Sequence, residues 1–184
     1  MLILASQSPR RSEILRQAGI EFIAKGADVD ESVQSGENPE DYVKRVAKQK
    51  ALAVKTGAGD IVLGADTIVV IDGEILGKPK DSGDADRMLK CLADRKHEVL
   101  TGICFRRGDE LTVDWAVTYV WLMPLTQGEI DDYVASGEPM DKAGAYAIQG
   151  IASKFIQRID GSYTNVVGLP VELVYAHLRK CGMV

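Results

Sequence analysis

The stretch LILASQSPRRSEIL, residues 2–15, passes from an apolar run through a small polar turn into a charged segment. The apolar run before Ser6 predicts a short buried strand. Ser8 and Pro9 predict the start of a helix, because serine caps helix N-termini and proline suits the first helical position. A strand that leads directly into a helix indicates an α/β protein.

The alternation continues along the whole chain. Helical spacing and end signals predict further helices at residues 38–57, 81–95, 126–139 and 165–182. Strand patterns occur at residues 20–24, 60–79, 97–123 and 154–161. Within them, Asp72-Gly73 and Arg107-Gly108-Asp109 predict hairpin turns, the second between two long antiparallel strands. The expected fold class is therefore α/β, with a mixed sheet flanked by helices.

Length and composition limit the possible classes of protein. The chain has 184 residues, of which 46% are hydrophobic and 27% charged, with a net charge of −5. This size suits one domain or two closely packed lobes, and we expect a single domain over residues 1–184. The negative charge argues against a nucleic acid or an anionic membrane surface as partner.

The sequence pattern predicts neither a membrane-spanning helix nor a signal peptide. The longest apolar run, IVLGADTIVVI at residues 61–71, contains Asp66 and is far shorter than the roughly twenty residues of a membrane-spanning helix. The N-terminal run is too brief for a signal peptide, and its arginines follow the apolar segment instead of preceding it. We therefore expect a cytoplasmic protein.

Cysteines and histidines are few and scattered. Cys91, Cys104 and Cys181 are widely spaced and odd in number, so we expect structural thiols and neither a disulfide framework nor a zinc site. His97 and His177 are the only histidines, which argues against histidine-based triads and multi-histidine metal sites. The chemistry is expected to depend on carboxylates, lysines, arginines or a metal ion.

Arg10 and Arg11 lie in the first turn of the helix that Ser8 begins. Backbone N–H groups and the helix dipole favour an anion there, and arginine adds donors that match phosphate oxygens. A surface helix with two solvated arginines is the alternative. The sequence predicts a small-anion site without specifying the anion.

Asp66 interrupts a run that otherwise predicts a central strand. A buried carboxylate is costly unless it is paired or bound to metal. Either Asp66 caps a strand end that turns to solvent at Gly64, or it leaves the sheet into a cleft and binds Mg²⁺ or takes a proton from water. In the second case Glu31 could supply another ligand and Lys50 could reach the same cleft. The alternative for each is an ordinary solvated surface position.

Lys78 could reach that cleft too, with a solvated surface position as its alternative. Two glycine-rich segments follow, GEPMDKAGAYAIQG at residues 137–150 and GSYTNVVGLP at residues 161–170. They indicate rigid turns where backbone approaches a ligand, or ordinary loops. Gln149 carries both donors and acceptors and could contact a nucleobase edge.

Taken together, several motifs resemble one known family. The motifs are LILASQSPRRSEIL, GADTIVV, GKP, Thr101-Gly102, GEPMDKAGAYAIQG and GSYTNVVGLP, in order along nearly the whole chain. The sequence is thereby similar to the Maf family of nucleoside triphosphate pyrophosphatases, once described as septum formation inhibitors. The segment DKAGAYAIQG resembles the branch that acts on dTTP and UTP, whereas the sister branch acts on 7-methyl-GTP.

The resemblance implies an elongated, twisted sheet like that of inosine triphosphate pyrophosphatases, with two lobes, a cleft between them and a homodimer. It also implies a divalent cation (Mg²⁺, with Mn²⁺ and Co²⁺ as alternatives) and hydrolysis of a nucleoside triphosphate to monophosphate and pyrophosphate. A nucleotide-binding regulator of septum formation and a phosphatase that releases orthophosphate are the alternatives in other classes.

The resemblance also implies roles for individual residues. Asp66 corresponds to the family's proton acceptor, and Glu31 to one of its polar cleft positions; our own hypothesis is that Asp66 and Glu31 bind the metal. Arg10, Thr67 and Gln149 correspond to positions linked to substrate choice. The substrate-binding and specificity positions together are Ser6, Arg10, Arg11, Lys50, Thr67, Lys78 and Gln149.

Overall fold

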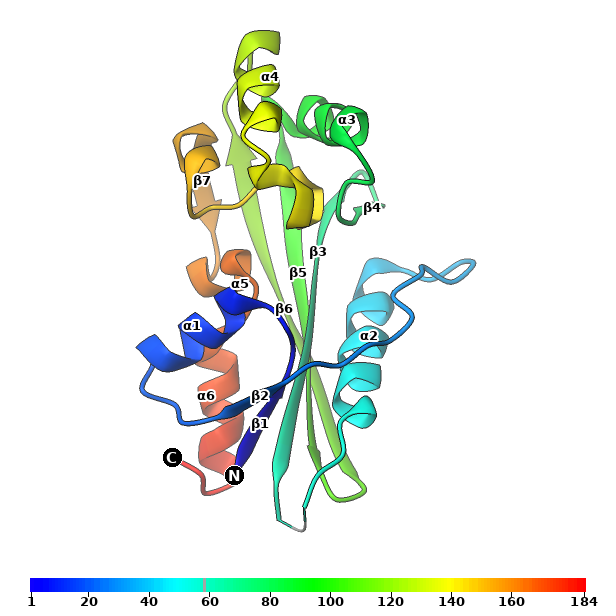
Figure 1. The fold of residues 1–184 in the computed structure, drawn as a ribbon, viewed down its shortest axis with the longest axis vertical. Helices are drawn as coiled ribbons and strands as arrows, with labels where there is room; N and C mark the ends of the chain where they lie inside the picture. Colours follow the sequence, from blue (N-terminus) through cyan, green and yellow to red (C-terminus); the bar gives the residue numbers. More distant parts are fainter. Residues whose placement is uncertain (58) are drawn as a thin grey trace. The chain divides into compact units, whose positions relative to one another are not determined.

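The computed structural model describes residues 1–57 and 59–184. The chain divides into two compact units. Unit 1 comprises Met1–Thr67, Thr101–Ala116 and Gly168–Val184, and unit 2 comprises Ile68–Leu100 and Val117–Val167. Figure 1 shows the course of the chain.

A seven-stranded sheet has the order β2-β1-β3-β5-β6-β7, with β4 paired to β3. Strand β1 is parallel to both β2 and β3, whereas β4 is antiparallel to β3 and β7 is antiparallel to β6. The predicted mixed α/β fold is thus confirmed. The strands are β1 Leu2–Ala5, β2 Ile23–Lys25, β3 Ile61–Ile71, β4 Glu74–Leu76, β5 Lys96–Arg107, β6 Glu110–Leu122 and β7 Ile156–Asp160.

The helices begin where the sequence places capping residues. The side chains of Ser8, Asn38, Asp81 and Thr126 each accept a backbone N–H of the first turn. The α-helices are α1 Pro9–Gln17, α2 Pro39–Ala53, α3 Ser82–Leu92, α4 Gln127–Ala135, α5 Tyr163–Val167 and α6 Val171–Lys180. The 3₁₀-helices are η1 Glu138–Asp141, η2 Ala143–Ala145 and η3 Ile151–Phe155.

Two glycines allow α2 to lie directly against the sheet in unit 1. A Cβ atom at Gly64 on β3 would lie 2.2 Å from the carbonyl oxygen of Ala47, and one at Gly102 on β5 would lie 2.3 Å from that of Val43. Only glycine permits such a close approach. In Figure 1, α2 accordingly runs alongside β3, which brings Lys50 of α2 close to that strand.

The strand predicted here is present, and the alternative of a break at Gly64 is wrong. Strand β3 continues without interruption from Ile61 to Ile71, and Asp66 lies within it with 5% of its surface exposed. Asp66 therefore neither caps a solvent-facing strand end nor leaves the sheet. Gly64 serves helix packing instead of ending the strand.

Both hairpin predictions are confirmed. Asp72 (φ 51°) and Gly73 (φ 80°) connect β3 to β4, and positive φ at both central residues is typical of a tight hairpin turn. Gly108 and Asp109 connect β5 to β6, which are neighbours in the sheet. Such a two-residue connection requires antiparallel strands.

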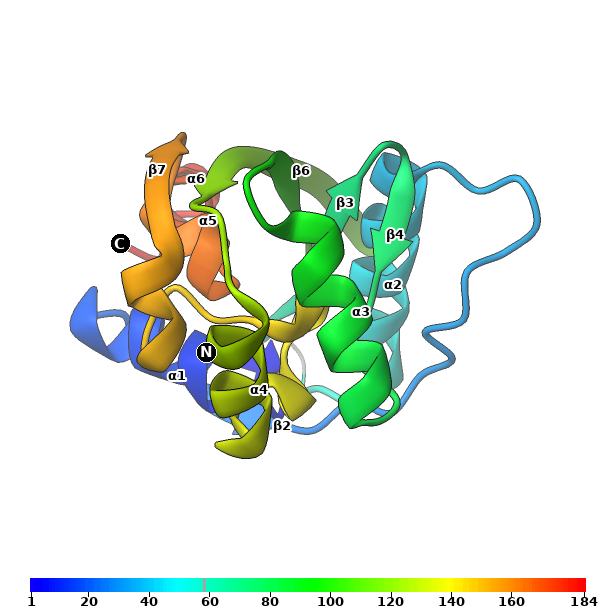
Figure 2. The ribbon, with the colours of Figure 1, turned by 90° about the horizontal axis from the view of Figure 1, so that it is seen from above.

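Unit 2 has its own apolar core. Helices α3 and α4 lie side by side in Figures 1 and 2, and they bury Leu89, Leu92, Ile130 and Tyr133 in this core. The glycine-rich segment of residues 137–150 contains the short helices η1 and η2, and η3 follows it before β7. The turns predicted in this segment therefore include 3₁₀ turns that pack against this core, whereas the second glycine-rich segment, residues 161–170, contains α5.

The single C-terminal helix expected for residues 165–182 is wrong, because two helices occupy this range. Gly168 has φ +130°, outside the helical region, and Leu169 precedes a proline, which disfavours helical backbone. The chain therefore leaves α5 at Val167 and starts α6 at Val171. The break makes the Gly168 carbonyl available as a hydrogen-bond acceptor.

Candidate active site

Ser6, Asp66 and Thr67 come from two neighbouring parallel strands of unit 1. Ala5 of β1 is opposite Gly64 of β3, so Ser6 follows β1 beside the part of β3 that carries Asp66 and Thr67. Ser6 and Asp66 are buried, with 7% and 5% exposed. The parallel pairing thus brings Ser6 beside Asp66 and Thr67, which lie about sixty positions later in the chain.

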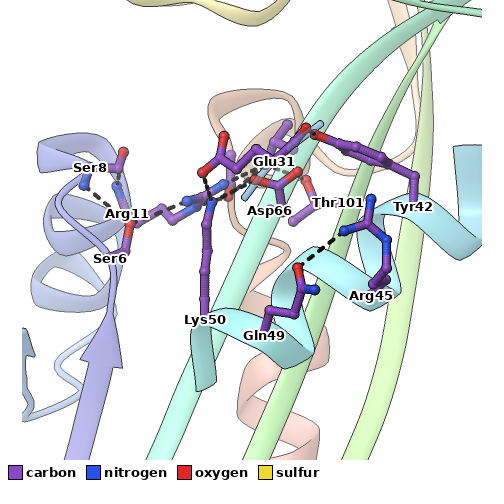
Figure 3. A network of polar contacts seen from close by, with 12 residues as sticks. Ser6, Ser8, Arg11, Glu31, Tyr42, Arg45, Gln49, Lys50, Asp66 and Thr101 are labelled. Carbon is purple, nitrogen blue, oxygen red and sulfur yellow. Dashed lines mark hydrogen bonds and ion pairs between the residues drawn. The ribbon is translucent and has the colours of Figure 1, made fainter. Parts of the chain in front are cut away.

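Arg11 is buried beside these strands. Its Nη1 donates to Ser6 Oγ at 3.2 Å, as Figure 3 shows, and its Nη2 donates to Thr67 Oγ1 at 3.0 Å. Its Nε donates to the Gly168 carbonyl oxygen at 2.8 Å. These bonds occupy three of the five N–H donors of the guanidinium. Arg11 therefore fixes Ser6 and Thr67 and adds a positive charge to the site.

A second set of contacts holds the Thr67 hydroxyl. Thr67 Oγ1 donates to the Gly168 carbonyl oxygen at 3.2 Å and lies 2.9 Å from Thr101 Oγ1. Thr101, on β5, is fully buried. Because a hydroxyl has a single hydrogen, Thr101 is the donor in the pair with Thr67. Thr67 is thus held in one orientation by three neighbours.

Lys50 lies between two carboxylates (Figure 3). Its Nζ is 2.7 Å from Asp66 Oδ1 and 2.7 Å from Glu31 Oε1. The side chains of Lys50 and Asp66 are buried, at 8% and 7% exposed, whereas that of Glu31 is 47% exposed. Lys50 thus provides the partner that a carboxylate buried in a strand requires. Glu31 contacts the same ammonium group and is itself half-exposed to solvent.

Burial is the main cause of the pKa shifts of Asp66 and Arg11. It raises the pKa of Asp66 above its ordinary value, although Lys50 and Arg11 act in the opposite direction. It also lowers the pKa of Arg11, which Asp66 and Glu31 oppose. A carboxylate with a raised pKa is better suited to accept a proton near neutral pH.

Three predicted residues remain to be placed. Arg10 is half-buried in the first turn of α1. Lys78 and Gln149 are exposed and belong to unit 2. The structure thus brings together Ser6, Arg11, Glu31, Lys50, Asp66 and Thr67 in unit 1.

Sequence reasoning missed several members of the cluster. Thr101 and Gly168 were part of family-like motifs without a role of their own, and Gly168 acts through its backbone carbonyl. Tyr42 fits the apolar spacing of its helix, which gives no sign that its hydroxyl donates to the Glu31 carbonyl oxygen at 2.7 Å. Arg45 had not been singled out, although its Nη2 donates to the Ser32 carbonyl oxygen at 2.9 Å.

Comparison with known proteins identifies the family. The Maf family, described as Maf-like protein, matches residues 1–181. The chain belongs to the Maf family. The resemblance carried by the motifs is therefore confirmed over nearly the whole sequence.

Similar Maf proteins are known from several bacteria. A dTTP/UTP pyrophosphatase of Anaeromyxobacter dehalogenans (strain 2CP-C) is 54% identical over 186 residues, which cover 98% of this chain and 94% of the relative. A dTTP/UTP pyrophosphatase of Geotalea uraniireducens (strain Rf4) is 52% identical over 187 residues, which cover 100% of this chain and 96% of the relative.

A solved structure supports the fold of this Maf chain. The Staphylococcus aureus Ham1 protein superposes with a TM-score of 0.51 at 16% sequence identity, covering 97% of this chain and 98% of that one. At this identity the likeness concerns the fold alone. No helix in residues 1–57 and 59–184 is both long and apolar enough to span a membrane.

Proposed function

We propose that this Maf protein hydrolyses dTTP and UTP to the nucleoside monophosphate and pyrophosphate. Relatives with that name are 52–54% identical over nearly the entire chain. The observation that carries the proposal is the Lys50 ammonium held 2.7 Å from both Asp66 and Glu31. This arrangement combines a buried base with positive charge, as phosphoanhydride hydrolysis requires.

The residues present are compatible with a divalent cation. Two carboxylates, Asp66 and Glu31, lie close together, each with an oxygen 2.7 Å from the Nζ atom of Lys50. No group of three or more His, Cys, Asp or Glu side chains able to hold a metal occurs among the described residues. The pair of carboxylates from Asp66 and Glu31 fits Mg²⁺, which typically uses one or two carboxylates together with substrate phosphates and water.

We propose that Asp66 and Glu31 hold the cation, with Mn²⁺ and Co²⁺ as alternatives to Mg²⁺. When bound, it supplies charge neutralisation for the triphosphate oxygens. The site is expected to lose metal affinity when either carboxylate is neutralised.

Asp66 is proposed to accept the proton of the attacking water. The water oxygen bonds to the α-phosphorus, the bond from that phosphorus to the oxygen bridging the β-phosphorus breaks, and pyrophosphate leaves with the electron pair. Negative charge grows on the non-bridging and leaving oxygens, so cations fixed beforehand stabilise the transition state. Lys50 and Arg11 are held in place for this role by the contacts described above.

Arg10 and Lys78 are proposed to bind phosphate oxygens, and Ser6 to orient them. Thr67, Arg10 and Gln149 are proposed to determine the choice of base. Gln149 is suited to this role because an amide offers both a donor and an acceptor. A base that leaves these groups unpaired would be rejected.

We further propose that the protein acts as a homodimer in the cytoplasm. Its three cysteines are free thiols, which suits a reducing compartment. Light scattering coupled to size-exclusion chromatography tests the dimer directly, and a mass near 20 kDa for the purified protein would contradict it.

The reaction is tested with a panel of dTTP, UTP, CTP and 7-methyl-GTP in the presence of Mg²⁺, with identification of the products. Pyrophosphate and monophosphate from dTTP and UTP support the proposal. Preferential turnover of 7-methyl-GTP would assign the chain to the sister activity. Orthophosphate would indicate a phosphatase, and binding without turnover would indicate a regulator.

A further inference from the structure

Tyr42, Arg45 and Gln49 lie on one face of α2, on the same helix as Lys50 (Figure 3). Tyr42 is 5% exposed, and the side chain of Arg45 is 19% exposed. None of the three belongs to the proposed catalytic or metal-binding set. Their contacts nevertheless lead to the loop that carries Glu31.

Two consecutive carbonyl groups of that loop are held by α2. The Tyr42 hydroxyl donates to the Glu31 carbonyl oxygen at 2.7 Å, and Arg45 Nη2 donates to the Ser32 carbonyl oxygen at 2.9 Å. The backbone is therefore fixed at Glu31 and at its neighbour. Two anchors on adjacent residues restrict both the position and the rotation of the peptide between them.

Arg45 is itself rigidly placed. Its Nε and Nη2 donate to the two carboxylate oxygens of Glu37 at 2.5 and 2.8 Å, and its Nη1 donates to Gln49 Oε1 at 3.1 Å. Its guanidinium carbon lies 5.3 Å from the centre of the Tyr42 ring. A lysine could not reproduce this planar, forked set of contacts.

Glu37 extends the anchoring to the other end of the loop. Its side chain is 8% exposed, and it accepts the backbone N–H of Gln34 at 3.1 Å. Arg45 thus joins the Ser32 carbonyl to Glu37, which closes the segment between residues 32 and 37 against α2. The loop has no strand or helix of its own to provide that order.

The order matters because of where the Glu31 side chain points. Its Oε1 atom is 2.7 Å from Lys50 Nζ, although its side chain is 47% exposed. A half-exposed carboxylate on an unanchored loop would lose conformational entropy in reaching a fixed site, whereas an anchored one loses less. Residues that hold a metal ligand in place through hydrogen bonds typically affect how tightly that ligand binds the metal.

We infer that Tyr42 and Arg45 are positioning residues that hold Glu31 beside Lys50 and Asp66. The inference deepens the proposed function and rests on it wherever Glu31 acts as a metal ligand. The anchoring itself is a property of the loop and is measurable without substrate.

The test uses Tyr42→Phe, which removes only the hydroxyl, and Arg45→Lys, which keeps the charge and loses the fork. In each variant we expect faster backbone amide exchange at residues 31–34, with exchange in β3 unchanged. We also expect the half-saturating Mg²⁺ concentration for UTP hydrolysis to rise about tenfold, with kcat at saturating Mg²⁺ nearly unchanged. Mn²⁺ alone, titrated by electron paramagnetic resonance, should bind correspondingly more weakly.

Arg87→Lys is the matched control. Arg87 also lies on a helix and pairs with the carboxylate of Asp84, but it belongs to unit 2. This variant should change neither the exchange at residues 31–34 nor the Mg²⁺ dependence. Unchanged loop exchange in both test variants would overturn the inference, as would a fall in kcat with an unchanged Mg²⁺ requirement.

Glu31→Gln separates the inference from the proposed function. If this variant leaves the Mg²⁺ and Mn²⁺ dependences unchanged, Glu31 is not a metal ligand and that part of the proposed function fails. The positioning inference is then decided by amide exchange alone. If Glu31→Gln weakens metal binding while Tyr42→Phe and Arg45→Lys do not, the inference fails and the proposed ligand stands.

Discussion

Replacing Lys50 by methionine removes one partner of the buried ion pair with Asp66 while keeping most of the side-chain volume. Both side chains are more than nine-tenths buried, at 8% and 7% exposed. Removal of Lys50 leaves the buried Asp66 carboxylate without its hydrogen-bonded partner, which costs about 3 kcal/mol of unfolding free energy. For a chain of 184 residues, that corresponds to a fall in Tm of about 6–12 °C.

Urea unfolding at a pH of about 8 measures the loss. Lys90→Met is the matched control, because Lys90 pairs with Asp86 at 2.8 Å on the surface of α3 with half of its side chain exposed. An exposed pair of this kind contributes about 0.5 kcal/mol or less. The double variant Lys50→Met/Asp66→Asn should regain most of the lost stability, because it removes the unpaired charge as well.

The reasoning is refuted if Lys50→Met costs no more than Lys90→Met. It is equally refuted if the double variant is as unstable as the sum of the two single variants. Either result would mean that the 2.7 Å contact of Lys50 with Asp66 does not compensate a buried charge.

Three further predictions concern other parts of the molecule. Gly64→Ala should destabilise the fold by about 2 kcal/mol or more, because the added Cβ would lie 2.2 Å from a backbone oxygen of α2. The control Gly128→Ala lies on an open helix surface and should leave stability unchanged or raise it. Equal urea midpoints for the two variants would refute the packing argument. Burial lowers the pKa of His97 to about 4, whereas an unfolded histidine titrates near about 6.5. Between pH of about 6.5 and about 4, the unfolded chain binds a proton that the folded chain does not, so the free energy of unfolding falls by about 3 kcal/mol as the pH decreases. The urea midpoint of His97→Leu should therefore depend less steeply on pH than that of the wild type. Equal pH dependences of the two midpoints would contradict this. Gln149→Ala should reduce the preference for UTP over CTP in kcat/KM, and an unchanged preference would assign base recognition to other residues.

The parts of the fold that could be predicted are those determined by residues close together in the sequence. Ser8-Pro9, Asn38-Pro39 and Thr126 begin helices because the capping side chain accepts the backbone N–H three residues later. The break at Gly168 was missed, because the helical spacing on either side of it outweighed the glycine and the nearby proline. Its physical basis, a backbone angle of φ +130°, is visible only in the structure.

The candidate site was predictable where charge contradicted its surroundings. Asp66 stands out in an apolar strand, and its pairing with Lys50 follows from the need to compensate a buried carboxylate. The contact of Arg11 with Gly168 joins residues 157 positions apart, so it depends on tertiary packing that no local pattern specifies. The hydroxyl of Tyr42 was hidden because a tyrosine in an amphipathic helix usually serves packing, and its acceptor is a backbone carbonyl that no sequence motif marks.

The most direct measurement is hydrolysis of UTP in water labelled with heavy oxygen, followed by mass spectrometry of both products, for the wild type and Asp66→Asn. The account predicts label in UMP and none in pyrophosphate, because water attacks the α-phosphorus. It also predicts that Asp66→Asn lowers kcat about a hundredfold or more while KM changes little. Label in pyrophosphate, release of orthophosphate, or near-normal turnover by Asp66→Asn would contradict the account.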